Sequence, residues 1–290
     1  MTRRGLADYY RVVDKSSVAK TDTPGKFMTR SLPPTLARIV ALLELDQAFL
    51  VTMADIEELR QQTGVKTNAK LISQRLRDLG WLLPTEQRGV WEFAPGAHAG
   101  PLGRGHPFRE VRAALLASPQ LSAAICLTSA LWAHGLADRA PEHPEVALPT
   151  GTVATASLKR AARVVHFDRC LETVHVRGTP VHAPATILTH LASRPSDVRS
   201  WSAVLEALPE LLELVETDDL RRELMGRPAA VATRLAYLIH GLDPKLASEL
   251  SPGDHGKVWF GPRGPLKRHN QMFKVADTVL PVSPDRLGQL

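Results

Sequence analysis

Residues 66–77 combine side chains whose types and spacing could read the edges of DNA bases. Apolar residues at three- and four-residue spacing predict the buried stripe of a helix, and they are Ala69, Ile72, Leu76 and Leu79. At about 100° per residue, the opposite face carries Thr67, Lys70, Leu71, Gln74 and Arg77. Lysine and arginine can bond to the guanine edge, glutamine to adenine, and a leucine can contact the thymine methyl group. We therefore expect this face to contact bases.

Phosphate contacts are expected next to this face. Lys66 and Asn68 stand at the start of the helix, and Gln87 and Arg88 lie at the tip of a predicted hairpin. Residues 66–77 hold four basic side chains and no acid, although residues 31–96 as a whole have a net charge of −1, seven basic against eight acidic. Basic charge concentrated on one face is what phosphate binding requires. The predicted DNA-binding residues are Lys66, Thr67, Asn68, Lys70, Gln74, Arg77, Gln87 and Arg88.

The elements around these residues follow one order. A first helix starts after Pro33 and Pro34 and buries Leu36, Ile39, Val40 and Leu43. A short strand at 48–51 precedes a second helix that Thr52 caps, Gly64 provides the turn, and the third helix ends at Gly80. Strands at 81–83 and 90–93 then form the hairpin. This order is that of a winged helix-turn-helix over residues 33–94; a domain of this kind can instead contact proteins.

The rest of the chain predicts a larger second domain. Three prolines and four glycines between positions 95 and 107 mark a linker, and residues 108–290 alternate short strands with helices. We expect an α+β protein in which the winged helix-turn-helix is followed by a mixed α/β domain. The chain of 290 residues has a net charge of +6, and seven of its basic residues lie in a predicted flexible arm at 1–32. Such an arm could follow DNA phosphates or remain solvated.

The second domain resembles the AbiEi-type antitoxins of bacterial abortive-infection toxin–antitoxin systems. The resemblance starts with Leu127 to Leu136, which contain a Ser-Ala pair and a His-Gly-Leu end, and with the strand that closes at Pro149. It continues in Gly178 to Val181, in Ala183 to Leu188, and in Gly226-Arg227-Pro228 before an apolar helix. The basic arm lies outside this pattern.

The resemblance implies a cytoplasmic antitoxin. Its N-terminal domain would bind double-stranded DNA at operator repeats and repress its own operon, and its C-terminal domain would antagonise a cognate nucleotidyltransferase-like toxin. Within the motif, packing and a hydrogen bond explain Ser129 and His134 as well as a partner contact does. A winged-helix regulator with a C-terminal effector-binding domain is the main alternative, and a nucleic-acid-processing enzyme is a further one.

The sequence offers no pattern for catalysis, a metal or a cofactor. The histidines lack metal-ligand spacing, and the glycines at 100–105 lack the strand and spacing of a dinucleotide site. No apolar run approaches the ~20 residues of a membrane span. Cys126 and Cys170 are expected to be reduced and buried. The acids between Glu206 and Glu223 suggest a solvated face or a docking surface, and the basic segment 261–270 suggests a mobile loop or a contact with phosphates.

Overall fold

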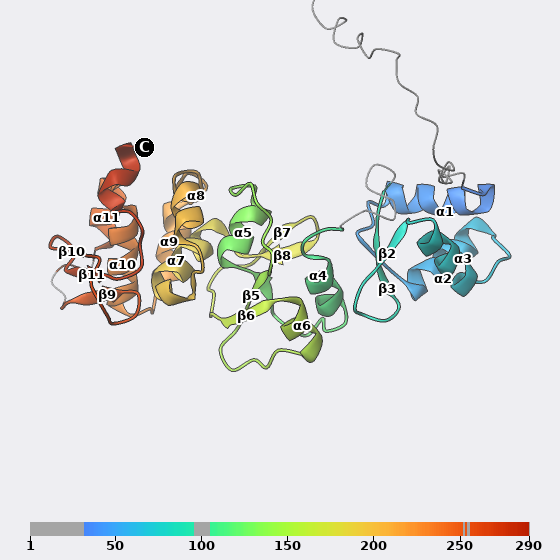
Figure 1. The fold of residues 1–290 in the computed structure, drawn as a ribbon, viewed down its shortest axis with the longest axis horizontal. Coiled ribbons are helices and arrows are strands. Elements are labelled where there is room, and N and C mark those ends of the chain that lie inside the picture. The colour runs from blue at the N-terminus through green and yellow to red at the C-terminus, as the bar shows by residue number, and fades with distance from the viewer. Residues whose placement is uncertain (1–31, 96–104, 252, 254–255, 290) are drawn as a thin grey trace, which may run out of the picture.

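The structure is a computed structural model that describes residues 32–95, 105–251, 253 and 256–289. Figure 1 shows three parts in a row along the long axis: an N-terminal unit, a central sheet with its helices, and a C-terminal group of helices with a small sheet. Except for Leu32, the predicted basic arm lies outside the described residues, as do positions 96–104 of the predicted linker.

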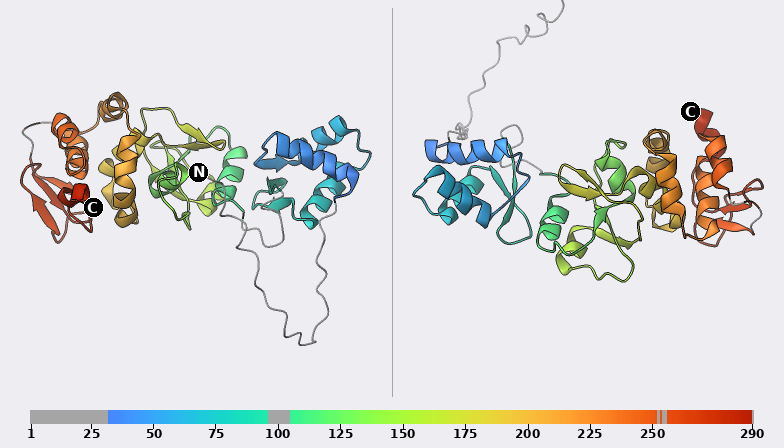
Figure 2. Two further views of the ribbon diagram at one scale, coloured as in Figure 1. Left: turned by 90° about the horizontal axis from the view of Figure 1, so that it is seen from above. Right: turned by 180° about the vertical axis from the view of Figure 1, so that it is seen from behind.

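The N-terminal unit has three helices and one antiparallel sheet in the predicted order. The helices are α1 (Pro34–Leu45), α2 (Met53–Thr63) and α3 (Ala69–Asp78). The strands are β1 (Leu50–Thr52), β2 (Leu82–Pro84) and β3 (Val90–Phe93), and the sheet order is β1-β3-β2. This sheet lies between the three helices and the central part of the molecule (Figures 1 and 2). The apolar side chains of the N-terminal unit form a hydrophobic cluster of their own.

Local capping sets the ends of α2 and α3. Thr52 and Asp55 form a reciprocal capping box, in which the Thr52 hydroxyl accepts from the Asp55 backbone N–H at 3.2 Å. Gly64 ends α2 with φ of 66°, a conformation that glycine adopts without strain. These signals are local, which is why the sequence predicts the helix–turn–helix segment well.

The central unit is built on a five-stranded sheet of order β6-β5-β4-β8-β7. Its strands are β4 (Ala124–Ile125), β5 (Glu145–Leu148), β6 (Arg163–His166), β7 (Val174–Val176) and β8 (Thr179–Val181). Three helices accompany it: α4 (Arg109–Leu116), α5 (Leu127–Ala133) and α6 (Ala156–Ala161). The β7–β8 hairpin turns at Arg177-Gly178, as predicted.

The C-terminal part packs helices against a three-stranded sheet of order β10-β11-β9. Its helices are α7 (Pro184–Ser193), α8 (Trp201–Glu213), α9 (Thr217–Leu224), α10 (Ala229–Ile239) and α11 (Pro244–Leu250), with 3-10 turns at Pro195–Asp197 and Pro284–Gln289. The strands are β9 (Val258–Phe260), β10 (Arg268–Asn270) and β11 (Val275–Asp277). One hydrophobic cluster runs through the central and C-terminal parts together. The whole is the α+β fold that the sequence predicts.

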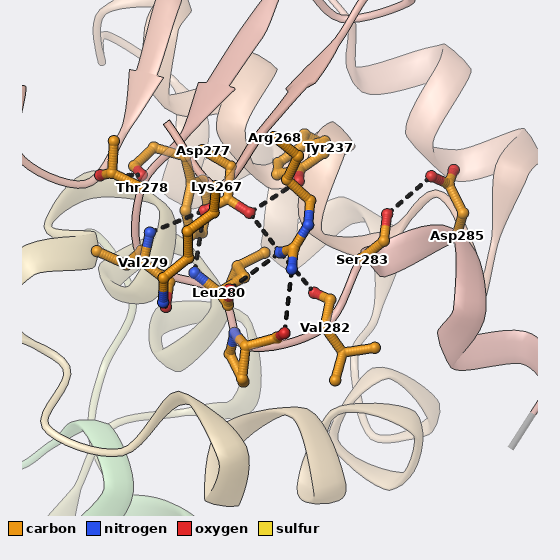
Figure 3. A network of polar contacts seen from close by, with 12 residues as sticks. Tyr237, Lys267, Arg268, Asp277, Thr278, Val279, Leu280, Val282, Ser283 and Asp285 are labelled. Carbon is orange, nitrogen blue, oxygen red and sulfur yellow. Dashed lines mark hydrogen bonds and ion pairs between the residues drawn. The ribbon is translucent and has the colours of Figure 1, made fainter. Parts of the chain in front are cut away.

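Asp277 holds the small C-terminal sheet in place. Its carboxylate accepts from the backbone N–H groups of Val279 and Leu280 at 2.9 Å, from the Tyr237 hydroxyl at 3.1 Å and from Arg268 at 2.8 Å (Figure 3). Arg268 lies in β10, and the Lys267 ammonium donates to the Val279 carbonyl at 2.9 Å. The prediction of a mobile loop over 261–270 is therefore wrong for Arg268 to Asn270, which form β10. The buried Asp277 carboxylate, 9 residues further along the chain, holds Arg268 in place.

Other local details differ from what the sequence predicts. The sequence predicts a helix that Thr128 caps, but α5 starts at Leu127 and the Thr128 hydroxyl donates to Glu145. The sequence predicts two helices, 201–208 and 209–215, but the structure has one, α8, in which Pro209 is exposed and Leu208 and Leu211 are buried. Cys126 is buried as expected, but Cys170 is exposed. Both motif side chains have structural partners: the Ser129 hydroxyl accepts from the Glu145 backbone N–H, and the His134 ring bonds to the His182 carbonyl.

Two buried histidines lie side by side between the sheet and α7. The rings of His182 and His190 are 5.6 Å apart, His190 stacks on Phe167 at 4.1 Å, and both are fully buried. Neither ring has a hydrogen-bond partner among the described residues. Burial lowers the pKa of His182 to about 3, and burial together with the neighbouring His182 lowers the pKa of His190 well below its usual value. Both rings are therefore neutral at pH 7.

We expect this pair to make the protein less stable in mild acid. Since both pKa values are lower in the folded state than the ~6.5 of an unfolded chain, the unfolded state binds more protons below pH 6.5. The free energy of unfolding should fall by about 1.4 kcal/mol per histidine for each pH unit below ~6.5. Urea denaturation between pH 7.5 and 5 measures this slope.

His190→Phe tests the assignment, because phenylalanine keeps the stacking on Phe167 and cannot be protonated. The pH slope should fall by about 1.4 kcal/mol per unit in this variant. The exposed His175→Asn serves as the control and should keep the slope of the wild type. An unchanged slope in His190→Phe would show that His190 does not cause the acid sensitivity.

Candidate nucleic-acid interface

Helix α3 turns the predicted base-contacting side chains toward solvent. Lys70, Gln74 and Arg77 are exposed, Thr67 is half-buried, and Leu71 is 37% exposed. The opposite side of α3 packs into the N-terminal core through Ala69, Ile72 and Leu76. The helix therefore has one rigidly held apolar face and one free polar face, as its sequence predicts.

The start of α3 has a structural role as well. The Asn68 side chain caps the helix, with its Oδ1 accepting from the Leu71 backbone N–H at 2.8 Å. Its amide N–H₂ group remains a donor, because the cap uses only the oxygen. Lys66 is exposed in the turn between α2 and α3. Both residues lie at the positive end of the helix dipole, where anions are favoured.

Arg77 connects α3 to the hairpin. Its guanidinium carbon lies 5.9 Å from the centroid of the Trp91 ring in β3. A cation over an aromatic face is held in position at a modest energetic gain. This contact restricts the Arg77 side chain near the end of α3, where Asp78 is the first acid after the basic segment.

The hairpin tip has one side in contact with the central unit. The Glu86 backbone N–H donates to the Glu110 carboxylate at 2.8 Å, and the Glu86 carboxylate pairs with Arg160 at 3.1 Å. Gln87 is half-buried, whereas Arg88 is exposed. The structure therefore gathers six of the predicted residues on α3 and the turn before it, and places Gln87 and Arg88 separately on the hairpin tip.

The sequence does not predict a polar cluster that lies between the N-terminal unit and the central unit. The Glu92 carboxylate of β3 accepts from the His106 backbone N–H at 2.7 Å. The Arg112 guanidinium of α4 lies 3.5 Å from the Phe49 ring centroid, and its Nε donates to the Thr179 hydroxyl. His106, which falls inside the predicted linker, packs its ring against Phe49. No periodic pattern marks these residues, because their partners are distant in the sequence.

Burial sets the charges in this cluster. It raises the pKa of Glu92 and lowers the pKa of His106 to about 4 and that of Arg112 to about 10. Arg112 is therefore charged and His106 neutral at pH 7. This cluster and the Glu86 contacts orient the N-terminal unit on the central unit, and so determine which way the α3 face points.

The described residues hold neither a cluster of metal-ligand type nor a membrane-spanning helix. They contain no group of three or more His, Cys, Asp or Glu side chains that could hold a metal ion. Every helix within them is too short or too polar to cross a membrane.

Comparisons with known proteins identify the second domain. Residues 123–241 match the model of the AbiEi antitoxin C-terminal domain. The chain is also similar to the RV2827C protein from Mycobacterium tuberculosis, known from a crystal structure, with a TM-score of 0.65 and 23% identity over 87% of this chain and 94% of that one. At this identity the likeness concerns the fold. No curated protein matches the chain.

The family match supports an antitoxin role in a toxin–antitoxin system, with the toxin of that system as the partner. The match covers all five strands of the central sheet and extends through α10. The chain is thus similar to the AbiEi-type antitoxins over residues 123–241.

Proposed function

We propose that the protein is a DNA-binding antitoxin that represses its own operon and antagonises a nucleotidyltransferase-like toxin. One observation carries the DNA-binding part: the free face of α3 presents Lys70, Gln74 and Arg77 on a helix held by caps and core packing. An AbiEi antitoxin domain in the same chain supports the antitoxin part. We infer that the protein acts in the cytoplasm and has no catalytic activity of its own.

The α2–turn–α3 segment and the β2–β3 hairpin are the parts of a winged helix-turn-helix. A helix about 10 to 12 Å in diameter fits a major groove about 12 Å wide, and the 10 residues of α3 extend about 15 Å. In this arrangement α3 is the recognition helix, Lys66 and Asn68 contact phosphates at its start, and Arg88 contacts a phosphate from the hairpin. Gln87 is assigned to the same hairpin contact.

A reporter gene behind the protein's own promoter tests repression. Expression of the wild-type protein should lower reporter output, and Lys70→Ala/Arg77→Ala should restore it. Co-expression with the product of a neighbouring nucleotidyltransferase-like reading frame tests antagonism, since growth should be rescued. Repression of the reporter without rescue of growth would support a role as transcriptional regulator and exclude an antitoxin role toward that toxin.

Arg88 gives a prediction for the hairpin. If Arg88 contacts a phosphate, Arg88→Ala should weaken binding to all DNA sequences alike. The slope of log K against log salt concentration should become shallower by ~0.9, the contribution of one phosphate. Fluorescence anisotropy between 50 and ~300 mM salt measures the slope.

Lys245→Ala provides the matched control, because Lys245 is an exposed cation on α11 at the far end of the molecule. This variant should keep the wild-type slope. The same slope in Arg88→Ala would remove the hairpin tip from the DNA interface and leave α3 alone.

A further inference from the structure

Strand β6 has an open outer edge. It pairs with β5 in parallel, and among the described residues no strand pairs with its other side. The backbone N–H groups of Arg163 and Phe167 donate to the Pro144 and Leu148 carbonyls at 2.8 and 2.9 Å. Because the backbone groups of successive residues point to opposite sides of a strand, the N–H and C=O groups of Val164 and His166 point outward.

A groove lies along this open edge. It has a volume of about 860 Å³ and is lined by residues of β6, of the loop that leads from β5 to α6, of α6 and of the end of α7. The residues that line it are Thr150, Gly151, Thr152, Val153, Ala154, Lys159, Ala162, Arg163, Val164, His166 and Arg194. Val153 is 78% exposed at its rim. The groove thus offers outward backbone groups together with exposed apolar surface.

The charge of the groove is positive. Lys159, Arg163 and Arg194 line it, and none of its lining residues is acidic. Glu145 pairs with Arg163 at 2.9 Å from behind, so this cation is largely balanced. Lys159 has no ion pair among the described residues, and the only carboxylate paired with Arg194 there is that of Asp197, at 4.0 Å. Lys159 therefore remains for a ligand, together with Arg194, whose ion pair is long.

We propose that this groove binds an extended, acidic segment of a partner protein, which pairs with β6 as a sixth strand of the sheet. The alternating donors and acceptors on Val164 and His166 match the backbone of a peptide. The phosphates of a nucleic acid only accept hydrogen bonds and would leave the outward carbonyls unpaired. The chain's own residues 1–30 carry seven basic side chains against three acids, and a second copy would bring its own basic groove, so both are disfavoured by charge.

This inference goes beyond the proposed DNA-binding function and uses none of its residues. The groove lies on the central unit, whereas the predicted DNA contacts lie between positions 66 and 88. Loss of peptide binding and loss of DNA binding are therefore separate results.

Fluorescence anisotropy with a labelled peptide of alternating glutamate and valine tests the proposal. The full-length protein should bind this peptide saturably, and a peptide with lysine in place of glutamate should not bind. Val164→Pro removes one outward N–H group without touching the ladder to β5, and proline is tolerated on edge strands. It should weaken binding about tenfold, the effect of about one net hydrogen bond.

Proline on the opposite edge is the matched control. His175→Pro changes β7, the other edge strand, and should leave peptide binding unchanged. Lys159→Glu/Arg194→Glu should abolish binding through charge. Circular dichroism establishes that each variant is folded.

N-methylated peptides keep the test decisive if Val164→Pro does not fold. Methylation of the alternate residues whose N–H groups face β6 should abolish binding, and methylation of the other set should be tolerated. Equal binding of both methylated peptides, or no binding of the acidic peptide to the wild-type protein, would exclude the proposal that a peptide pairs with β6. Tighter binding of labelled single-stranded dT12, lost in Lys159→Glu/Arg194→Glu, would assign the groove to nucleic acid instead.

Discussion

Glu223→Ala is expected to lower the free energy of unfolding by about 3 to 5 kcal/mol, the cost of breaking a buried ion pair from one side. Glu223 is fully buried, and its Oε1 accepts from the backbone N–H groups of Cys170 and Leu171 at 3.1 and 3.0 Å. The Thr186 hydroxyl donates to the same oxygen at 2.6 Å, and Arg227 pairs with Oε2 at 2.8 Å. Truncation would remove the carboxylate partner of the half-buried Arg227 and leave two backbone donors unpaired.

Two further variants locate the cause of this loss. Glu223→Gln keeps an acceptor but places an amide donor or a neutral oxygen beside Arg227, so an intermediate loss is expected. Glu216→Ala removes an exposed carboxylate at the start of α9 and should change stability by no more than about 0.5 kcal/mol. Urea denaturation at pH 7 measures all three. A loss below about 1 kcal/mol in Glu223→Ala would mean that the described network does not stabilise the fold.

Lys70→Ala and Arg77→Ala are each expected to cost about 1 to 3 kcal/mol of operator binding. Both side chains lie on the free face of α3, and each can donate to a guanine edge. Each variant should relax sequence preference at one base position, and the double variant should lose roughly the sum. Gln74→Ala should relax preference at an adenine in the same way.

Arg38→Ala is the matched control for these variants, because it removes an exposed cation from α1 of the same unit. It should leave base preference unchanged. Since Arg77 also contacts Trp91, the thermal midpoint of each variant establishes that its fold is intact. Wild-type affinity in both Lys70→Ala and Arg77→Ala would exclude α3 as the recognition helix.

The sequence predicts α3 well because its signals are local. The apolar spacing of Ile72 and Leu76 and the cap at Asn68 lie within one short segment, so they specify both the helix and its free face. The same holds for the capping box at Thr52. That these residues contact DNA stays a prediction.

Buried charges could not be predicted in this way. Glu223 belongs to a run of acids that reads as a solvated face, but Cys170 and Thr186 bring it partners from 53 and 37 residues away. Arg112 likewise looks like a surface residue of α4 until Phe49 and Thr179 cover it. Such positions depend on tertiary packing, which periodicity does not contain.

The open edge of β6 is hidden from the sequence for a related reason. The run Arg163 to His166 predicts a strand, but only the sheet order shows that it has one neighbour. The groove beside it combines a loop, a helix and Arg194, which are separate in the chain.

A mobility shift with the purified protein on its own promoter fragment tests the central claim most directly. The competitor is an unrelated fragment of equal length, at ~150 mM salt, near physiological ionic strength. The account predicts selective retention of the promoter fragment by the wild type and loss of that selectivity in Lys70→Ala/Arg77→Ala. Equal retention of both fragments, or retention of neither, would contradict sequence-specific DNA binding by this protein.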